Sequence, residues 1–171
     1  IRLITDQAPR ARELVGLAPY VPEPLRTDIL QEALDTLATI QDDHACLDAL
    51  VELAPGFPEE MLAAILGSVS TIADEADRAG TLTELVPALS AYPALIAQAL
   101  ELAQQIEEEE YFALALTGLA SALSPQQQEH VLQLALAIRD ERYRTQTFIA
   151  LIPHLPIHLV QVILQATSHL W

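Results

Sequence analysis

Apolar and polar residues follow a helical pattern that recurs along the whole chain. Five phrases each begin with an isoleucine that is followed two positions later by an acid. The isoleucines are Ile4, Ile40, Ile72, Ile106 and Ile138, so successive phrases start 36, 32, 34 and 32 residues apart. A repeat of this length is typical of proteins built from stacked pairs of helices.

Two apolar positions in each phrase mark the buried face of a first helix. The position ten residues after the isoleucine is Leu14, Leu50, Leu82, Leu116 or Phe148. The position thirteen residues after it is Leu17, Leu53, Leu85, Leu119 or Leu151. Because residues three apart share one side of a helix, each phrase predicts a helix with a single apolar stripe.

Proline and serine divide each repeat into two helices. Fifteen residues after the isoleucine stands Pro19, Pro55, Pro87, Ser121 or Pro153, and eighteen after it stands Pro22, Pro58, Ser90, Ser124 or Pro156. The earlier position should end the first helix, because proline lacks an amide donor and disfavours helix in the residue before it. The later one suits the start of the next helix, and Ser124 with Gln127 predicts a capping box. In the first repeat the second helix is expected to bury Leu25, Ile29, Ala33, Leu34, Leu37 and Ile40.

These observations predict an all-α protein, an α-solenoid of about five antiparallel helical hairpins that forms a single domain over residues 1–171. The expected repeats cover residues 4–39, 40–71, 72–105, 106–137 and 138–171. The chain starts at Ile1 and stops at Trp171 within an apolar pattern, which suggests a piece of a longer protein. The last helix, from Ile157, has no Asp, Glu, Lys or Arg. It is expected to offer Leu159, Val160, Ile163 and Leu164 to more chain or to a second copy.

Composition narrows the function classes. A net charge of −16 opposes binding to nucleic acid, which needs clustered Lys and Arg. No apolar run is long enough to predict a membrane span. One cysteine, Cys46, and the lack of a signal-peptide pattern favour the cytoplasm. We expect no cofactor and no enzymatic activity.

The acids two positions after each isoleucine have two structural interpretations. They are Asp6, Asp42, Asp74, Glu108 and Asp140. One interpretation is a cap for the first helix, since a carboxylate can accept the free N–H groups there. The other is an ion pair with an arginine four residues later, which predicts Asp6–Arg10, Asp74–Arg78 and Asp140–Arg144.

Three clusters could be considered for metal binding or catalysis, but each favours a structural interpretation. His154 and His158 are four residues apart, yet Pro156 between them should interrupt the helix. Asp42, Asp43, His44 and Cys46 combine donor atoms, but Cys46 takes the position that Arg10, Arg78 and Arg144 hold in other repeats. The acids from Glu107 to Glu110 are what a helix N-terminus favours. We therefore expect no metal site.

The charge on the first helices suggests where a partner binds. Counted from the residue after each isoleucine to the second proline or serine, the five segments carry 0, −4, −3, −4 and +1. Stacked first helices would join these acids into a stripe bordered by Arg12 and Arg142. The candidate partner-binding face consists of Asp43, Asp48, Glu52, Glu75, Asp77, Glu84, Glu109 and Glu110. It would attract a basic protein or peptide, or another domain of the same polypeptide. The alternative, which we weigh above it, is that these acids only solvate the outer surface.

The proline-containing phrases between the two helices of a repeat resemble those of a known kind of repeat. The phrases at residues 17–22, 53–58 and 151–156, Leu-Ala-Pro-Tyr-Val-Pro, Leu-Ala-Pro-Gly-Phe-Pro and Leu-Ile-Pro-His-Leu-Pro, are similar to the "LAPHLP" helical repeats of bacterial signalling ATPases of the STAND class. The resemblance implies a sensor or scaffold arm of a larger signalling protein. Its geometry would be like that of tetratricopeptide repeats without their Trp, Gly and Tyr signature.

Three function classes follow from these patterns. The first is a protein-binding or sensor module. The second is a structural spacer or oligomerisation arm, which would self-associate through the apolar terminal helix. The third, an enzyme or metalloprotein around His44 and Cys46, ranks well below both.

Overall fold

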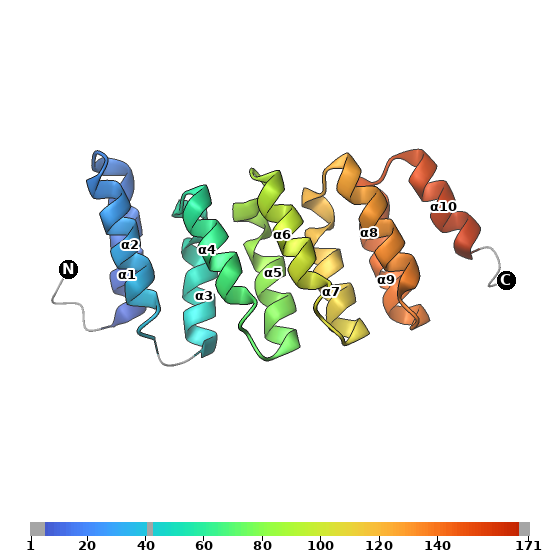
Figure 1. Ribbon diagram of the computed structural model, residues 1–171, viewed down its shortest axis with the longest axis horizontal. Coiled ribbons are helices and arrows are strands. Elements are labelled where there is room, and N and C mark those ends of the chain that lie inside the picture. Colours follow the sequence, from blue (N-terminus) through green and yellow to red (C-terminus); the bar gives the residue numbers. More distant parts are fainter. Residues whose placement is uncertain (1–5, 41–42, 168–171) are drawn as a thin grey trace. The chain divides into compact units, whose positions relative to one another are not determined.

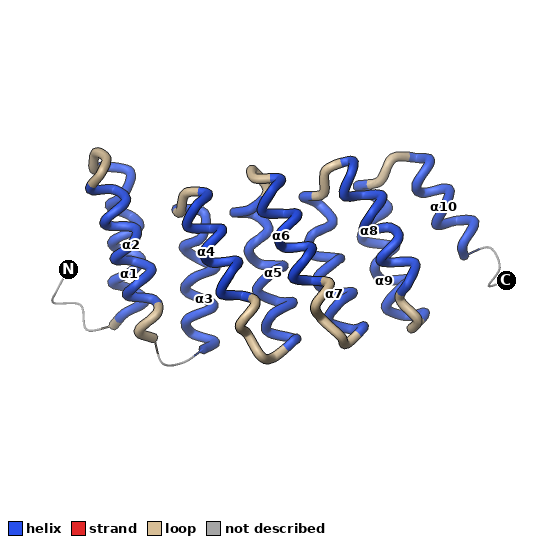
Figure 2. Tube along the Cα trace, in the orientation of Figure 1, coloured by secondary structure: helices blue, strands red, loops and turns tan. Residues whose placement is uncertain are grey.

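The computed structural model describes residues 6–40 and 43–167, and this part of the chain is all-α (Figures 1 and 2). The α-helices of the described part are α1 (Gln7–Leu17), α2 (Leu25–Leu37), α3 (Asp43–Leu53), α4 (Glu59–Val69), α5 (Glu75–Leu89), α6 (Pro93–Ala103), α7 (Glu109–Leu119), α8 (Pro125–Ala137), α9 (Glu141–Leu151) and α10 (Ile157–Thr167). Short 3-10 helices follow α1, α3, α7 and α9. The predicted all-α class is confirmed. None of the described helices combines the length and apolar character needed to cross a bilayer.

The helices group into two compact units, Ile1–Leu62 and Ala63–Trp171, with α4 running across the boundary. In the first unit α1 and α2 form a tight hairpin, and α3 contacts both of them. In the second unit α5 packs on α7 and α7 packs on α9, so the first helices lie side by side in chain order (Figure 1). The second helix α6 packs against α5 and α7, while α8 packs against α7 and α9. Within this unit, α6 and α8 therefore each pack on the first helix of their own hairpin and on the first helix of the next hairpin.

Helix starts follow the predicted caps in part. Ser124 Oγ accepts the Gln127 amide at 3.4 Å, and Gln127 Oε1 accepts the Ser124 amide at 2.8 Å, so the predicted capping box is confirmed. Asp74 and Asp140 also cap their helices, and Asp140 accepts the amide of Arg142 at 2.8 Å. Capping is wrong for Asp6 and Glu108, which make no side-chain cap bond. Asp42 lies outside the described residues.

Three of the described first helices end before proline, α7 ends before Ser121, and α5 departs from the prediction. The helices α1, α3 and α9 each stop two residues before a proline and turn into a 3-10 helix at Ala18–Tyr20, Ala54–Gly56 and Ile152–His154. In α5 the prediction is wrong, because the helix runs through Pro87 to Leu89. Proline removes a single amide from the helix, and the bonding resumes when Ser90 N–H reaches Val86 O at 2.9 Å.

The core consists largely of the predicted apolar stripe. In the second unit the residues ten and thirteen after each isoleucine are all buried: Leu82, Leu116, Phe148, Leu85, Leu119 and Leu151. In the first hairpin the prediction is wrong for Leu25, which is exposed, while Leu30 is buried instead. Leu25 is the first residue of α2, and the buried residues of this helix begin one turn later, at Leu30.

The last helix packs more closely on its own chain than the sequence suggested. Leu159 and Ile163, expected to await a missing neighbour, are already buried, and Val160 is half-buried. Leu164 is exposed, as predicted. The apolar residues of α10 thus lie on two faces, one buried and one exposed. The lack of charged residues in this helix could not show which residue belongs to which face.

The predicted ion pairs between an acid and the arginine four residues later are wrong. Arg10 Nη2 instead pairs with Glu32 Oε1 of α2 at 2.6 Å. Arg78 donates to the carbonyl of Ile72 from Nε at 3.1 Å and from Nη2 at 2.9 Å, and Arg144 Nη1 donates to Ile138 O at 2.9 Å. These carbonyls lie at the start of their repeats, just before the first helix, and need a donor, whereas an exposed ion pair contributes little.

Candidate partner-binding face

The eight predicted acids lie on both units. Asp48 and Glu52 belong to the first unit, and both are exposed on α3. Asp43 begins α3, but its side chain lies outside the described residues. The remaining five residues, Glu75, Asp77, Glu84, Glu109 and Glu110, belong to the first helices α5 and α7 of the second unit. The continuous stripe over all eight stays a prediction, while several members have structural partners.

Glu52 is held by an arginine of the preceding first helix. Arg12 of α1 donates from Nε to Glu52 Oε1 at 2.9 Å and from Nη2 to Oε2 at 2.6 Å, which is a two-bond fork. This hydrogen bonding lowers the pKa of Glu52 and raises that of Arg12. The predicted border residue Arg12 therefore neutralises an acid of the face.

Glu75 and Glu109 form a repeated contact between hairpins, which we call the carboxylate clamp. The Glu75 carboxylate accepts the backbone amides of Glu107, at 3.1 Å, and Glu108, at 2.9 Å. One repeat later, Glu109 accepts the amides of Arg139 at 2.9 Å and Asp140 at 2.8 Å. Both glutamates stand three residues after the repeat isoleucine and receive the two amides ahead of the next first helix. The clamp thus fixes the register of neighbouring hairpins.

Sequence reasoning missed the clamp although its pattern is present. An acid recurs three residues after the isoleucine in four repeats, at Asp43, Glu75, Glu109 and Glu141. The position looked like ordinary acidic enrichment of a first turn. Only the spatial approach of the next repeat identifies its partners.

The clamp predicts how stability depends on pH. Hydrogen bonds from the amides of Glu108 and Asp140 lower the pKa values of Glu75 and Glu109, respectively. Their contribution is therefore present above the ordinary glutamate pKa and is lost as the pH falls through the lowered value. A Glu75→Gln, Glu109→Gln double variant should melt at a lower temperature than the wild-type chain near neutral pH. That difference should shrink steadily on acidification.

The matched control is Glu84→Gln, which removes one exposed charge from the same helix as Glu75. Melting curves followed by circular dichroism across the pH series would give the comparison. A melting difference that stays constant down to the acid limit would contradict the clamp.

A groove opens between α7 and α9 on the predicted face. Its volume is about 310 Å³, and its lining includes Glu110, Tyr111, Leu114, Arg142, Tyr143 and Gln146. Tyr143 O–H donates to Glu110 Oε2 at 2.8 Å, which ties the two helices together and raises the pKa of Tyr143. The Arg142 guanidinium lies 5.7 Å from the centre of the Tyr143 ring, within the range of a cation–π contact.

The wall of the groove that α7 forms contains an exposed leucine and a tyrosine close to acidic side chains. Leu114 of α7 keeps 44% of its surface exposed. The pKa of Tyr111 is raised chiefly by the nearby charge of Glu108, with further contributions from burial and from Glu110, Asp74 and Glu75. Tyr111 therefore lies in a negative potential, next to an open leucine.

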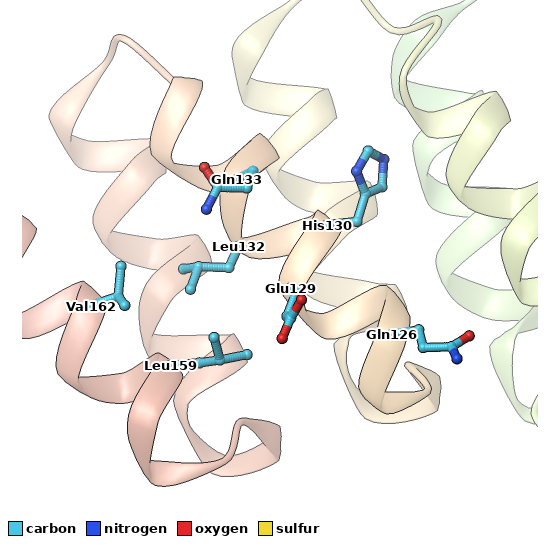
Figure 3. Close-up of a pocket in the computed structure, with 7 residues that line it drawn as sticks. All are labelled: Gln126, Glu129, His130, Leu132, Gln133, Leu159 and Val162. Atoms are coloured by element: carbon cyan, nitrogen blue, oxygen red, sulfur yellow. The ribbon is translucent and has the colours of Figure 1, made fainter.

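A second groove, of about 400 Å³, lies between the second helices α8 and α10 (Figure 3). Leu132, Leu159 and Val162 gather between the two helices, while Gln126 and His130 lie on the other side of α8. Leu132 and Leu159 are buried already, so this groove exposes little apolar surface. It lacks the aromatic and arginine side chains of the α7–α9 groove.

Of the three clusters considered for chemistry, the acids from Glu107 to Glu110 supply Glu110 to the α7–α9 groove, and the other two line neither groove. His154 and His158 are exposed on η4 and α10. The Cys46 thiol donates to Leu37 O at 3.4 Å, again using the repeat position that supplies a donor to a carbonyl. In the described part of the chain, no three His, Cys, Asp or Glu side chains come together as a metal site would require.

Comparisons with protein-family models, with curated proteins and with solved structures found no match for this chain.

Proposed function

We propose that this chain is a non-catalytic helical-repeat binding module that holds a protein or peptide segment in the groove between α7 and α9. The supporting observation is that an exposed leucine, two tyrosines and an arginine meet in one hollow of the first-helix face. Tyrosine and arginine are enriched among the residues that dominate binding energy at protein interfaces. Placed on two packed helices, they form a rigid site that needs little ordering on binding.

The segment we propose is basic, with lysine or arginine beside an apolar side chain. A cation would approach Tyr111, where Glu108 and Glu110 set a negative potential. The apolar side chain would cover Leu114. The chain's net charge of −16 would also speed the encounter with such a partner, and this effect should weaken as salt is added.

The same proposal includes the kind of protein to which this chain would belong. The LAPHLP-like phrases favour an arm of a larger cytoplasmic signalling protein in which the five hairpins stack as one solenoid. The competing proposal is a spacer or oligomerisation arm with no ligand. It is favoured by exposed apolar residues at the end of the second unit, which include Ile149 and Ile152.

A peptide selection distinguishes these two functions. A phage-displayed library of random dodecamer peptides would be selected on the immobilised chain, and enriched peptides would be synthesised for titration calorimetry. We expect peptides with basic and apolar residues whose affinity falls at least about tenfold for Leu114→Asn, the loss expected when an interface anchor is truncated.

The matched control is Ile149→Asn, which makes the same kind of change at an exposed residue outside the groove. It should leave the peptide affinity unchanged. Failure to enrich any peptide, or equal binding to the Leu114→Asn chain, would reject the binding module in favour of the spacer.

A further inference from the structure

The α7–α9 groove has a counterpart one repeat earlier, where α5 packs on α7. Leu114 and Tyr143 line the groove from its two helices, and they stand eight and five residues after their repeat isoleucines. One repeat earlier these two positions are Gly80 of α5 and Tyr111 of α7. Because α5 packs on α7 as α7 packs on α9, Gly80 and Tyr111 take part in the same kind of helix contact.

The α5 side of this counterpart is more open than the α7 side of the groove. No atom lies within 4 Å of the Cβ position of Gly80, so the space that a side chain would take is empty. At the equivalent position α7 has the large side chain of Leu114. The position four residues after the isoleucine differs in the same way, since Ala76 stands where the next repeat has Glu110. There is thus room for a foreign side chain over α5.

Tyr143 has two partners within the chain that the equivalent positions do not give to Tyr111. The O–H of Tyr143 donates to Glu110 Oε2 at 2.8 Å, and the Arg142 guanidinium lies 5.7 Å from the ring centre. For Tyr111, the position of the acceptor is Ala76, whose side chain has no acceptor atom. The position of the cation is Glu110, which is an acid.

The electrostatic surroundings of the two tyrosines differ accordingly. For Tyr143, the charge of Arg142 opposes the rise in pKa that Glu110 and burial cause. For Tyr111, burial and acids all raise the pKa. The acids are, in order of their contributions, Glu108, Glu110, Asp74 and Glu75. A positive charge that is supplied from outside would therefore be attracted to Tyr111.

We infer that the space over Gly80, beside Tyr111, binds an arginine side chain of the same segment whose apolar side chain covers Leu114, and this inference rests on the proposed function. The arginine would do for Tyr111 what Arg142 does for Tyr143. Arginine suits this position better than lysine, because its planar guanidinium stacks on an aromatic ring and can pair with a carboxylate through two N–H groups.

The same geometry sets the spacing of the two side chains in the bound segment. Packed helices lie about 8–10 Å apart, and an extended chain advances about 3.3 Å per residue. An extended segment that crosses from α7 to α5 therefore places its arginine about three residues from the apolar residue that covers Leu114.

A nuclear magnetic resonance titration of the full chain with two defined peptides tests the inference. The first is Gly-Ser-Leu-Gly-Ser-Arg-Gly-Ser with both ends capped, and the second has citrulline in place of arginine. Citrulline has nearly the same shape but no charge, so the wild-type chain should bind the arginine peptide roughly tenfold more tightly. Gly80→Leu, which gives α5 the leucine that α7 carries at this position, should remove the difference.

The matched control is Gly67→Leu. No atom lies within 4 Å of the Cβ position of Gly67 either, and this residue belongs to α4. The control makes the same change in another helix, away from α5 and α7, and should keep the preference for arginine. Circular dichroism would check that both variants keep the wild-type helix content, which is expected because both positions are open.

Two results would overturn the inference while the proposed function stands. They are equal binding of the two peptides by the wild-type chain, and a preference for arginine that the Gly80→Leu chain retains. In both cases Leu114→Asn would still weaken the binding of both peptides. If the wild-type chain binds neither peptide, the inference is overturned as well, whereas the proposed function is decided separately by the peptide selection.

Discussion

Leu116→Ala should lower the free energy of unfolding by about 2–5 kcal/mol, the usual loss when a buried leucine is truncated and a cavity remains. Leu116 lies in α7 and is fully buried. Because α7 packs between α5 and α9, the cavity would disturb two interfaces at once. Urea denaturation followed by circular dichroism would measure the loss.

The control for this change lies two residues away on the same helix. Leu114→Ala removes the same atoms from a side chain that is 44% exposed, so its loss should be well below that of Leu116→Ala. Equal losses for the two variants would mean that α7 is not buried between its neighbours in the way described.

Gly118→Ala should destabilise the chain although alanine favours helices. The added methyl group would fall on the Thr83 side chain of α5. Overpacking of this kind costs about 1–3 kcal/mol, which exceeds the gain of roughly 1 kcal/mol that alanine brings to a helix interior. Thermal melting of the variant would show the direction of the change.

Gly80→Ala is the matched control, since no atom lies within 4 Å of the added methyl group. It should stabilise the chain by up to about 1 kcal/mol. Adding Thr83→Ala to Gly118→Ala should recover part of the loss, because the two side chains share one contact and their effects are not additive. A stabilising Gly118→Ala would disprove the close approach of α5 and α7.

Local chemistry explains why the helices and their caps could be predicted. Proline, serine and the apolar stripe act over a few residues, so the helix boundaries and the capping box of Ser124 with Gln127 are readable from spacing alone. The continuation of α5 through Pro87 was not, because a single missing amide is a small loss when the surrounding helix is packed.

Contacts between repeats were harder to predict. Arg78 was assigned to Asp74, its neighbour on the helix, but it satisfies the carbonyl of Ile72. Likewise, Glu75 and Glu109 were predicted to bind a partner molecule, but their carboxylates accept hydrogen bonds from backbone amides of the next hairpin. In both cases the partner is a backbone carbonyl or amide in a segment between helices. Its position depends on the conformation of that segment, which spacing in the sequence does not give.

The candidate site was predicted in its location more than in its chemistry. The charge count pointed to the first helices and included Glu110 with Arg142 at its border, both of which line the α7–α9 groove. It passed over Tyr111, Leu114 and Tyr143, because uncharged residues on an exposed helix face do not enter a charge count. An exposed leucine beside tyrosines at helical spacing is the pattern that could have revealed the groove.

A single nuclear Overhauser measurement tests most directly whether consecutive first helices lie side by side. With the threonine methyl groups labelled, the Thr83 methyl should show a strong cross-peak to the α-protons of Gly118, which lies 35 residues further along the chain. Cross-peaks from Thr83 only to residues of its own helix would contradict the packing of α5 on α7, and with it the first-helix face on which the proposed groove depends.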